Sequence, residues 1–177
     1  MGEKLMSKRR GSSALGALGA LGALVAGFAL LLSPFAVPQA QAAYSWEGAS
    51  ASALQDYANR LVTQVNKRRA SHGLPALRMN TCVDGFSSSW ATWLDTYDKF
   101  QHADLGRLMN RCSLVYAAEN LAGWSGSVAP SNVVKLWMNS DGHRQNILSS
   151  RARRVGVTVV YDRSRRQYLA VMEFARL

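Results

Sequence analysis

From Ala51 onward, apolar residues follow the three- and four-residue spacing of one helix face. These positions are Leu54, Tyr57, Ala58, Leu61, Val62 and Val65. Ser50 or Ser52 can cap the start of a helix here. At the other end, Gly73 can adopt the left-handed conformation that follows a helix, and Pro75 prevents continuation. The pattern therefore predicts a long amphipathic helix that begins at Ala51 and ends before Gly73.

A second apolar and aromatic stretch predicts another helix, from Asn80 to Tyr97, with Trp90 and Trp93 on one side. Residues 100–106 lose this spacing, and we expect an ordered connection there that is broken by a glycine. Helical spacing returns over Pro130–Asn139. The sequence therefore predicts three substantial helices.

Residues typical of β-strands occupy the remaining segments. Val115–Ala118 predicts a strand with Glu119 at its exit, closed by the glycines of residues 123–126. Arg154–Tyr161 and Gln167–Glu173 alternate β-branched and aromatic residues around a polar loop, which predicts a hairpin. Helices and strands that do not alternate regularly indicate an α+β domain, here a three-layer α-β-α sandwich with a small, mainly antiparallel sheet.

The first residues have the composition of a secretory signal peptide. A basic stretch, residues 1–10, precedes the apolar run Ala14–Ala36, and Ala40-Gln41-Ala42 supplies a small-x-small cleavage pattern. We expect a signal peptide over residues 1–42, a short linker over 43–50 and one domain over 51–177. The protein would then be secreted, or associated with the cell wall, without a stable membrane anchor. An uncleaved anchor stays open, because the apolar run is long enough to span a bilayer.

The chain has 177 residues and a net charge of +10. Lys4, Lys8, Arg9 and Arg10 against Glu3 give the predicted leader +3, which leaves +7 for the exported part. Basic residues are scattered over that part, for example Lys67–Arg69 and Arg163–Arg166, which favours a solvated basic surface. Because no basic stripe interleaved with aromatic residues occurs, we expect no specific nucleic-acid partner. We expect a monomer.

Two cysteines, Cys82 and Cys112, lie in the exported part. An even pair in an oxidising compartment predicts one disulfide. A disulfide that closes the loop between them would stabilise the folded state by roughly 3 to 4 kcal/mol in the chain-entropy model. Neither cysteine belongs to a C-x-x-C pair, which argues against redox catalysis and against a cysteine-rich zinc site.

Three histidines and one glutamate are the candidates for chemistry. His72 lies in a turn and is interpreted as a surface residue, whereas His102 and His143 lie in short connections flanked by glycine. Two imidazoles and the carboxylate of Glu119 could hold a divalent metal with a position open for water or substrate. Spacing does not decide between this metal set and a structural hydrogen-bonding role.

Two hydrolase patterns can be tested against the sequence. Gly123–Ser127 is one residue out of register with the nucleophile elbow and lacks its context, so we reject it. Ser140, His143 and Glu119 could imitate a catalytic triad, but no residue marks an oxyanion site. The residues alone therefore identify no hydrolase.

Five segments, in this order, are similar to the CAP superfamily, which includes cysteine-rich secretory proteins, venom antigens and plant pathogenesis-related proteins. The segments are Val65–Arg69 with His72–Leu77, Phe100–His102, Ala118–Ala122, Trp137–Leu148 and Val155–Val157. The resemblance covers Leu54 to Phe174, and the chain resembles the short bacterial branch of the superfamily. It implies an α-β-α sandwich with a cleft lined by two histidines and two acids, which holds zinc or another divalent ion in some members.

The resemblance implies that His102, Glu119 and His143 line this cleft and are the metal ligands if a metal binds. Ser140 replaces the fourth residue, a glutamate in animal and plant members, which leaves at most a His-His-Glu set. Asn120 and Asn146 are expected to hold the surrounding segments by hydrogen bonds rather than to contact a ligand.

The resemblance favours a secreted, non-enzymatic binding module with a lipid, peptide or cell-wall polymer as its ligand. The alternative is a metal-assisted hydrolase of extracellular or envelope material, with Glu119 and His143 as its catalytic residues and zinc as its cofactor. A third hypothesis is that the cleft is structural and that the cationic surface binds the partner, in which case affinity would fall steeply with salt.

Overall fold

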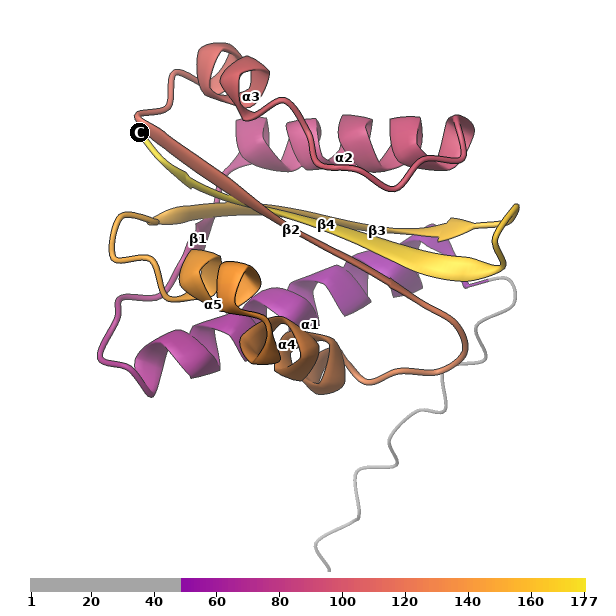
Figure 1. Ribbon diagram of the computed structural model, residues 1–177, viewed down its shortest axis with the longest axis horizontal. Coiled ribbons are helices and arrows are strands. Elements are labelled where there is room, and N and C mark those ends of the chain that lie inside the picture. Colours follow the sequence, from indigo (N-terminus) through magenta and orange to yellow (C-terminus); the bar gives the residue numbers. More distant parts are fainter. Residues whose placement is uncertain (1–48) are drawn as a thin grey trace, which may run out of the picture. The chain divides into compact units, whose positions relative to one another are not determined.

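The structure is a computed structural model that describes residues 49–177, so the predicted signal peptide and nearly all of the predicted linker lie outside the described residues. A four-stranded sheet lies between two layers of helices (Figure 1). One layer contains α1 (Ala51–Ala70), α4 (Pro130–Asn139) and α5 (Asp141–Ile147), and the other contains α2 (Thr81–Thr96) and α3 (Leu105–Cys112). No helix of the described part is both long and apolar enough to cross a membrane.

The sheet is mixed but mainly antiparallel. Its strands are β1 (Arg78–Met79), β2 (Tyr116–Trp124), β3 (Arg154–Asp162) and β4 (Gln167–Arg176), in the order β1-β3-β4-β2. Only the pairing of β1 with β3 is parallel. The α+β sandwich and the hairpin of β3 and β4 confirm the prediction, whereas β1 is too short to show any alternation in the sequence.

The ends of the two long helices follow the predicted signals. The Ser50 hydroxyl accepts a hydrogen bond from the Ala53 amide (3.2 Å), and the Asn80 side chain accepts one from the Val83 amide (3.1 Å). Each cap satisfies an amide that has no partner within its own helix. These contacts fix where α1 and α2 begin.

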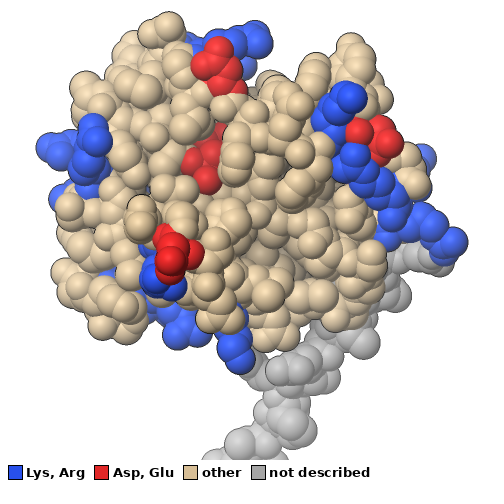
Figure 2. All heavy atoms as spheres, in the orientation of Figure 1, with Lys and Arg blue, Asp and Glu red and all other residues tan. Residues whose placement is uncertain are grey.

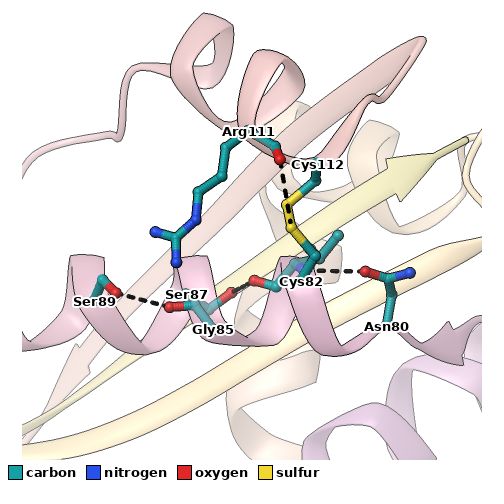
Figure 3. The surroundings of a disulfide bond; sticks show 8 residues. Asn80, Cys82, Gly85, Ser87, Ser89, Arg111 and Cys112 are labelled. Carbon is teal, nitrogen blue, oxygen red and sulfur yellow. Dashed lines mark hydrogen bonds between the residues drawn. A yellow bond between two sulfur atoms is a disulfide. The ribbon is translucent and has the colours of Figure 1, made fainter.

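Helix α3 is absent from the sequence prediction, which expected a connection broken by a glycine. The Asp104 carboxylate caps this helix by accepting from the Gly106 amide (2.9 Å) and the Arg107 amide (3.3 Å). Gly106 therefore lies in the first turn of α3 and does not interrupt it. The predicted disulfide is confirmed, since Cys82 in the first turn of α2 is bonded to Cys112 at the end of α3 (Figure 3).

Apolar side chains bury both faces of the sheet. Toward α1 and α4 the core contains Tyr57, Leu61, Val65, Trp137, Val157 and Phe174. Toward α2 it contains Ala91, Leu94, Leu121, Leu169 and Val171. Successive residues of a strand point to opposite faces, so β2, β3 and β4 each supply side chains to both cores.

Most basic side chains lie on the surface, with one exception. On the face shown in Figure 2, Lys and Arg lie mainly around the periphery and form no continuous patch. Arg69, however, is fully buried, although Lys67 and Arg68 beside it are exposed. The interpretation of Lys67–Arg69 as solvated surface is therefore wrong for Arg69.

The close approach of α2 to β3 requires glycine at position 156. A Cβ atom placed on Gly156 would lie 2.4 Å from the Asp84 nitrogen and 2.4 Å from the Val83 carbonyl carbon. Both are backbone atoms near the start of α2, so no flexible side chain can move away. We expect Gly156→Ala to lower the free energy of unfolding by about 3 kcal/mol, because α2 must shift away from the sheet. Urea unfolding followed by circular dichroism measures this change.

Gly85 provides the control for this prediction. It lies within α2, and a Cβ atom added there would meet nothing within 4 Å. Gly85→Ala should therefore raise stability by about 0.5 to 1 kcal/mol, because alanine favours the helix interior. Equal effects of the two substitutions would contradict the assigned packing of α2 on β3.

Candidate functional site

Two of the residues predicted for the site form a direct pair. His102 lies between α2 and α3, and its Nδ1 atom is 2.5 Å from Oε1 of Glu119 in β2. The same carboxylate oxygen accepts a hydrogen bond from the Ala103 amide (3.1 Å). The Glu119 side chain is 1% exposed and that of His102 is 63% exposed. A buried carboxylate therefore fixes an imidazole that faces solvent.

The position of Glu119 corrects the prediction that it lies at the exit of a short strand. β2 continues to Trp124, because β4 pairs with it along its whole length, from Tyr116 opposite Arg176 to Trp124 opposite Tyr168. Glu119 is thus inside the strand, and alternation places it on the same side as Leu121, toward α2. The strand holds the carboxylate more firmly than a loop would.

His143 is held beside β2 by backbone and amide contacts. The Asn120 side chain donates to the His143 carbonyl (3.1 Å). Asn146 donates to the Glu119 carbonyl (2.9 Å) and to the Asn120 side-chain oxygen (2.9 Å). Arg144 donates to the Met138 carbonyl (2.9 Å). The roles expected for the two asparagines, which join α5 to β2, agree with these contacts.

The surroundings of His143 disfavour its charged form. Burial lowers the pKa of the half-buried His143, and the positive charge of His102 lowers it further. His143 is therefore neutral at neutral pH. It lies in the first turn of α5, which begins at Asp141, and not in a short connection as the sequence predicted. Ser140 precedes α5 and makes no capping hydrogen bond with its side chain. His72 is exposed after the end of α1, as predicted.

Sequence reasoning did not assign Glu173 to this site. Glu173 lies directly opposite Glu119 in the β2–β4 register, and both residues are buried. No donor of the described residues reaches Oε2 of Glu119 or either carboxyl oxygen of Glu173. Burial raises the pKa of Glu173 to about 10. The charge of Glu119 and a hydrogen bond between the two carboxyl groups contribute to this rise. A protonated Glu173 is therefore the donor that the pair requires.

The predicted metal ligands do not fit a three-ligand site in this arrangement. Among residues 49–177, no group of three or more His, Cys, Asp or Glu side chains is placed to hold a metal ion. The Nδ1 atom of His102 and Oε1 of Glu119 are bonded to each other instead. No chemical step is therefore assigned to a metal, and metal binding stays a prediction from the sequence.

A cavity of about 650 Å³ opens beside His102. One side is formed by α2, and the other by residues 101–104 and α3. We call this cavity the α2–α3 groove. Its volume lies within the range of ligand sites for small molecules.

The motifs that build this site also decide the family. The sequence model of the cysteine-rich secretory protein family, CAP, matches residues 62–174, which is more than half of the chain. The chain belongs to the CAP family. This match confirms the resemblance drawn from the five sequence segments, and it contains His102, Glu119 and His143.

Relatives of this CAP chain come from several bacteria. It is 34% identical over 118 residues to the uncharacterized protein YkwD of Bacillus subtilis, a match that covers 62% of the chain and 44% of YkwD. The chain therefore spans less than half the length of this relative.

Solved structures confirm the CAP fold. An outer surface protein of Borrelia burgdorferi superposes with a TM-score of 0.58 at 18% identity, over 67% of this chain and 90% of that protein. A cysteine-rich secretory protein of Staphylococcus aureus gives a TM-score of 0.57 at 20% identity, over 70% of this chain and 39% of that protein. An extracellular protein of Bacillus anthracis that contains an SCP domain gives a TM-score of 0.56 at 24% identity, over 73% of this chain and 45% of that protein.

Proposed function

We propose that this CAP protein is an extracellular, non-enzymatic binding module whose ligand contacts His102 beside the α2–α3 groove. The observation that carries the proposal is the pair of a buried Glu119 with an exposed His102. Because an ionised carboxylate only accepts, Nδ1 of His102 donates to Glu119, which leaves Nε2 as the ring nitrogen that can contact a ligand. The exposed imidazole is thus oriented toward a partner before any partner arrives.

The extracellular location in this proposal rests on three observations. The first residues have the composition of a signal peptide. The Cys82–Cys112 disulfide suits an oxidising compartment. Two of the similar structures are described as an outer surface protein and an extracellular protein. A lipid, a peptide or a cell-wall polymer outside the cell is therefore the class of ligand to test.

We do not propose the metal-assisted hydrolase. That reaction requires a metal ion to polarise the substrate, and the described residues bring no three-ligand set together. Glu119 would act as its base, yet this carboxylate is buried and already accepts from His102 and from the Ala103 amide. The geometry suits orientation of the imidazole better than proton abstraction from a substrate.

Nuclear magnetic resonance of the histidine rings tests the proposed function. The exported domain would be titrated with soluble peptidoglycan fragments, phosphatidylglycerol vesicles and an unstructured peptide mixture. We expect one class to shift the ring signals of His102 and His143 by more than the line width. His72 is an internal control, because it is exposed after α1 and bonded to the Arg68 carbonyl, away from the site.

Three outcomes would contradict the proposal. One is that no ligand class moves the His102 ring, and another is that all three histidines move together, which indicates nonspecific association. In a third, zinc alone shifts His102 and His143, and a substrate is then turned over in a way that Glu119→Gln abolishes. This last outcome would support the hydrolase. The variant His102→Ala should lose the ligand-induced shift of the His143 ring. Its unfolding temperature establishes that the domain is still folded after Glu119 has lost this partner.

A further inference from the structure

The α2–α3 groove has two walls that a covalent bond holds together. Phe86, Trp90 and Trp93 line it from one face of α2, at the spacing of successive helical turns. The opposite wall contains Arg107 and Arg111 of α3. The Cys82–Cys112 disulfide joins the two helices, and Figure 3 shows the Arg111 side chain reaching from α3 toward α2. The width of the groove is therefore constrained before a ligand binds.

Aromatic rings form the apolar part of this groove. Trp90 and Trp93 are stacked, with ring centroids 4.7 Å apart and an angle of 5° between the planes. Tyr97 extends the row, 5.1 Å from Trp93. The Trp90 Nε1 atom is buried and has no hydrogen-bond partner among the described residues. The adjacent rings thus give the groove a flat apolar surface.

Two cations in the groove are available to a ligand. Neither guanidinium of Arg107 and Arg111 makes a hydrogen bond or ion pair with another described residue. Asp104, the only acid in the lining, is engaged at the start of α3. The groove therefore carries unbalanced positive charge, and guanidinium groups bind carboxylates and phosphates in a bidentate manner.

The mixture of polar and apolar lining selects among anionic ligands. Six of the ten residues that line the groove are polar or charged. A fatty chain would remove these groups from water without replacing their hydrogen bonds, which is costly. A sugar ring has an apolar C–H face for stacking on tryptophan and hydroxyl groups for the polar side chains. A polymeric nucleic acid would need many more phosphate contacts than two arginines provide.

We propose that the α2–α3 groove binds an acidic polysaccharide, with a sugar ring stacked on Trp90 and Trp93 and its anionic group held by Arg107 and Arg111. This inference rests on the proposed function, because the groove opens beside His102 and gives the ligand of that site a chemical class. A wall or capsule polymer with uronic acid or phosphate groups has this chemistry.

Calorimetric titration with two matched probes tests the inference. Trigalacturonate is the acidic probe, and maltotriose is a neutral probe of the same length. We expect the unmodified exported domain to bind trigalacturonate at least about tenfold more tightly than maltotriose. The double variant Arg107→Gln, Arg111→Gln should lose this preference, and Trp93→Leu should weaken binding of both probes. Unfolding temperatures establish that the variants are folded.

A second double variant controls for net charge. Lys67→Gln, Arg68→Gln removes the same two charges from exposed positions on α1, on the other side of the sheet. It should bind trigalacturonate as the unmodified domain does. Equal loss in both double variants would overturn the inference, because it would show attraction by overall charge. Binding of phosphatidylglycerol vesicles but of neither saccharide would also overturn it.

Failure of this inference and failure of the proposed function are distinguishable. If trigalacturonate does not bind, but peptide or vesicles shift the His102 ring, the acidic polysaccharide is excluded and the binding module stands. If no probe shifts His102 and none binds the groove, both fail. If trigalacturonate binds and shifts His102 but not His72, both are supported.

Discussion

Replacing Arg69 with alanine is expected to lower the free energy of unfolding by about 4 kcal/mol, which is a large fraction of the stability of an ordinary domain. The Arg69 guanidinium is fully buried and has no carboxylate partner among the described residues. It donates instead to four backbone carbonyls, those of Pro75, Ile147, Ser149 and Ala152, at 2.7 to 3.2 Å. Alanine would leave these acceptors without their donor and create a cavity.

The contacts of Arg69 explain why the site depends on it. They join the end of α1 to the turn before β1 and to the segment between α5 and β3. α5 carries His143, so the loss of Arg69 should also loosen one wall of the site. Burial lowers the pKa of the Arg69 guanidinium, and the charge of Arg153 lowers it further, yet an arginine in this position stays protonated.

Urea unfolding of three variants measures this effect. Arg69→Lys should recover only a small part of the loss, because one ammonium group cannot reach carbonyls on three sides as a planar guanidinium does. Arg68→Ala is the matched control, since Arg68 is the exposed neighbour on the same helix and its replacement should change stability by less than about 0.5 kcal/mol. Similar losses in Arg68→Ala and Arg69→Ala would show that the buried contacts are not the cause.

Arg69 also shows what sequence patterns can and cannot provide. Position 69 follows Leu61, Val62 and Val65 at helical spacing, but the predicted apolar stripe ended at Val65. The charge of the residue favoured an exposed position. Only the tertiary structure shows that the carbonyls of Pro75 and of a distant segment, residues 147–152, require a donor at this position.

Local signals were sufficient for most of the fold. Periodic apolar positions identified α1, α2 and α4, with a capping serine for α1, and β-branched alternation identified the hairpin of β3 and β4. α3 was missed because the glycine at position 106 outweighed the capping signal of Asp104. The extent of β2 was underestimated because a Glu-Asn pair disfavours a strand locally. Pairing with β4 overrides that preference.

The candidate site was predictable only in part. His102 and Glu119 were connected by the order of the family motifs, since their spacing carries no chemical signature. Glu173 could not be added in the same way. Its relation to Glu119 depends on the register of two strands that are far apart in the sequence. The Trp90–Trp93 platform was visible as an aromatic side of α2, but its neighbours Arg107 and Arg111 come from the helix that was missed.

Glu173→Gln is expected to change how stability depends on pH. Burial and the charge of Glu119 raise the pKa of Glu173 in the folded protein. Above the ordinary pKa of a glutamate, near 4.5, the unfolded chain releases the carboxyl proton of Glu173 while the folded state keeps it. The unfolded state therefore binds fewer protons through the neutral range, and the contribution of this group to stability falls as pH rises toward 10. Glutamine has a similar shape and cannot lose that proton.

The difference in unfolding free energy between Glu173→Gln and the unmodified protein should therefore grow in favour of the variant by roughly 4 kcal/mol between pH 5 and pH 8. Urea unfolding at each pH gives this difference. Groups that titrate in the same way in both proteins contribute equally to the two free energies and therefore cancel. The charged group that raises the pKa of Glu173 is Glu119 of β2, which His102 binds.

Asp56→Asn separates this effect from a general loss of negative charge. Asp56 is exposed on α1 and pairs with Arg60, so its replacement should leave the pH dependence parallel to that of the unmodified protein. A Glu173→Gln curve that is also parallel would show that Glu173 ionises normally, and Glu119 would then lack a protonated neighbour. The expected divergence would instead show that Glu173, which the strand register places opposite Glu119, keeps its proton. Glu119 then keeps its negative charge, which orients His102.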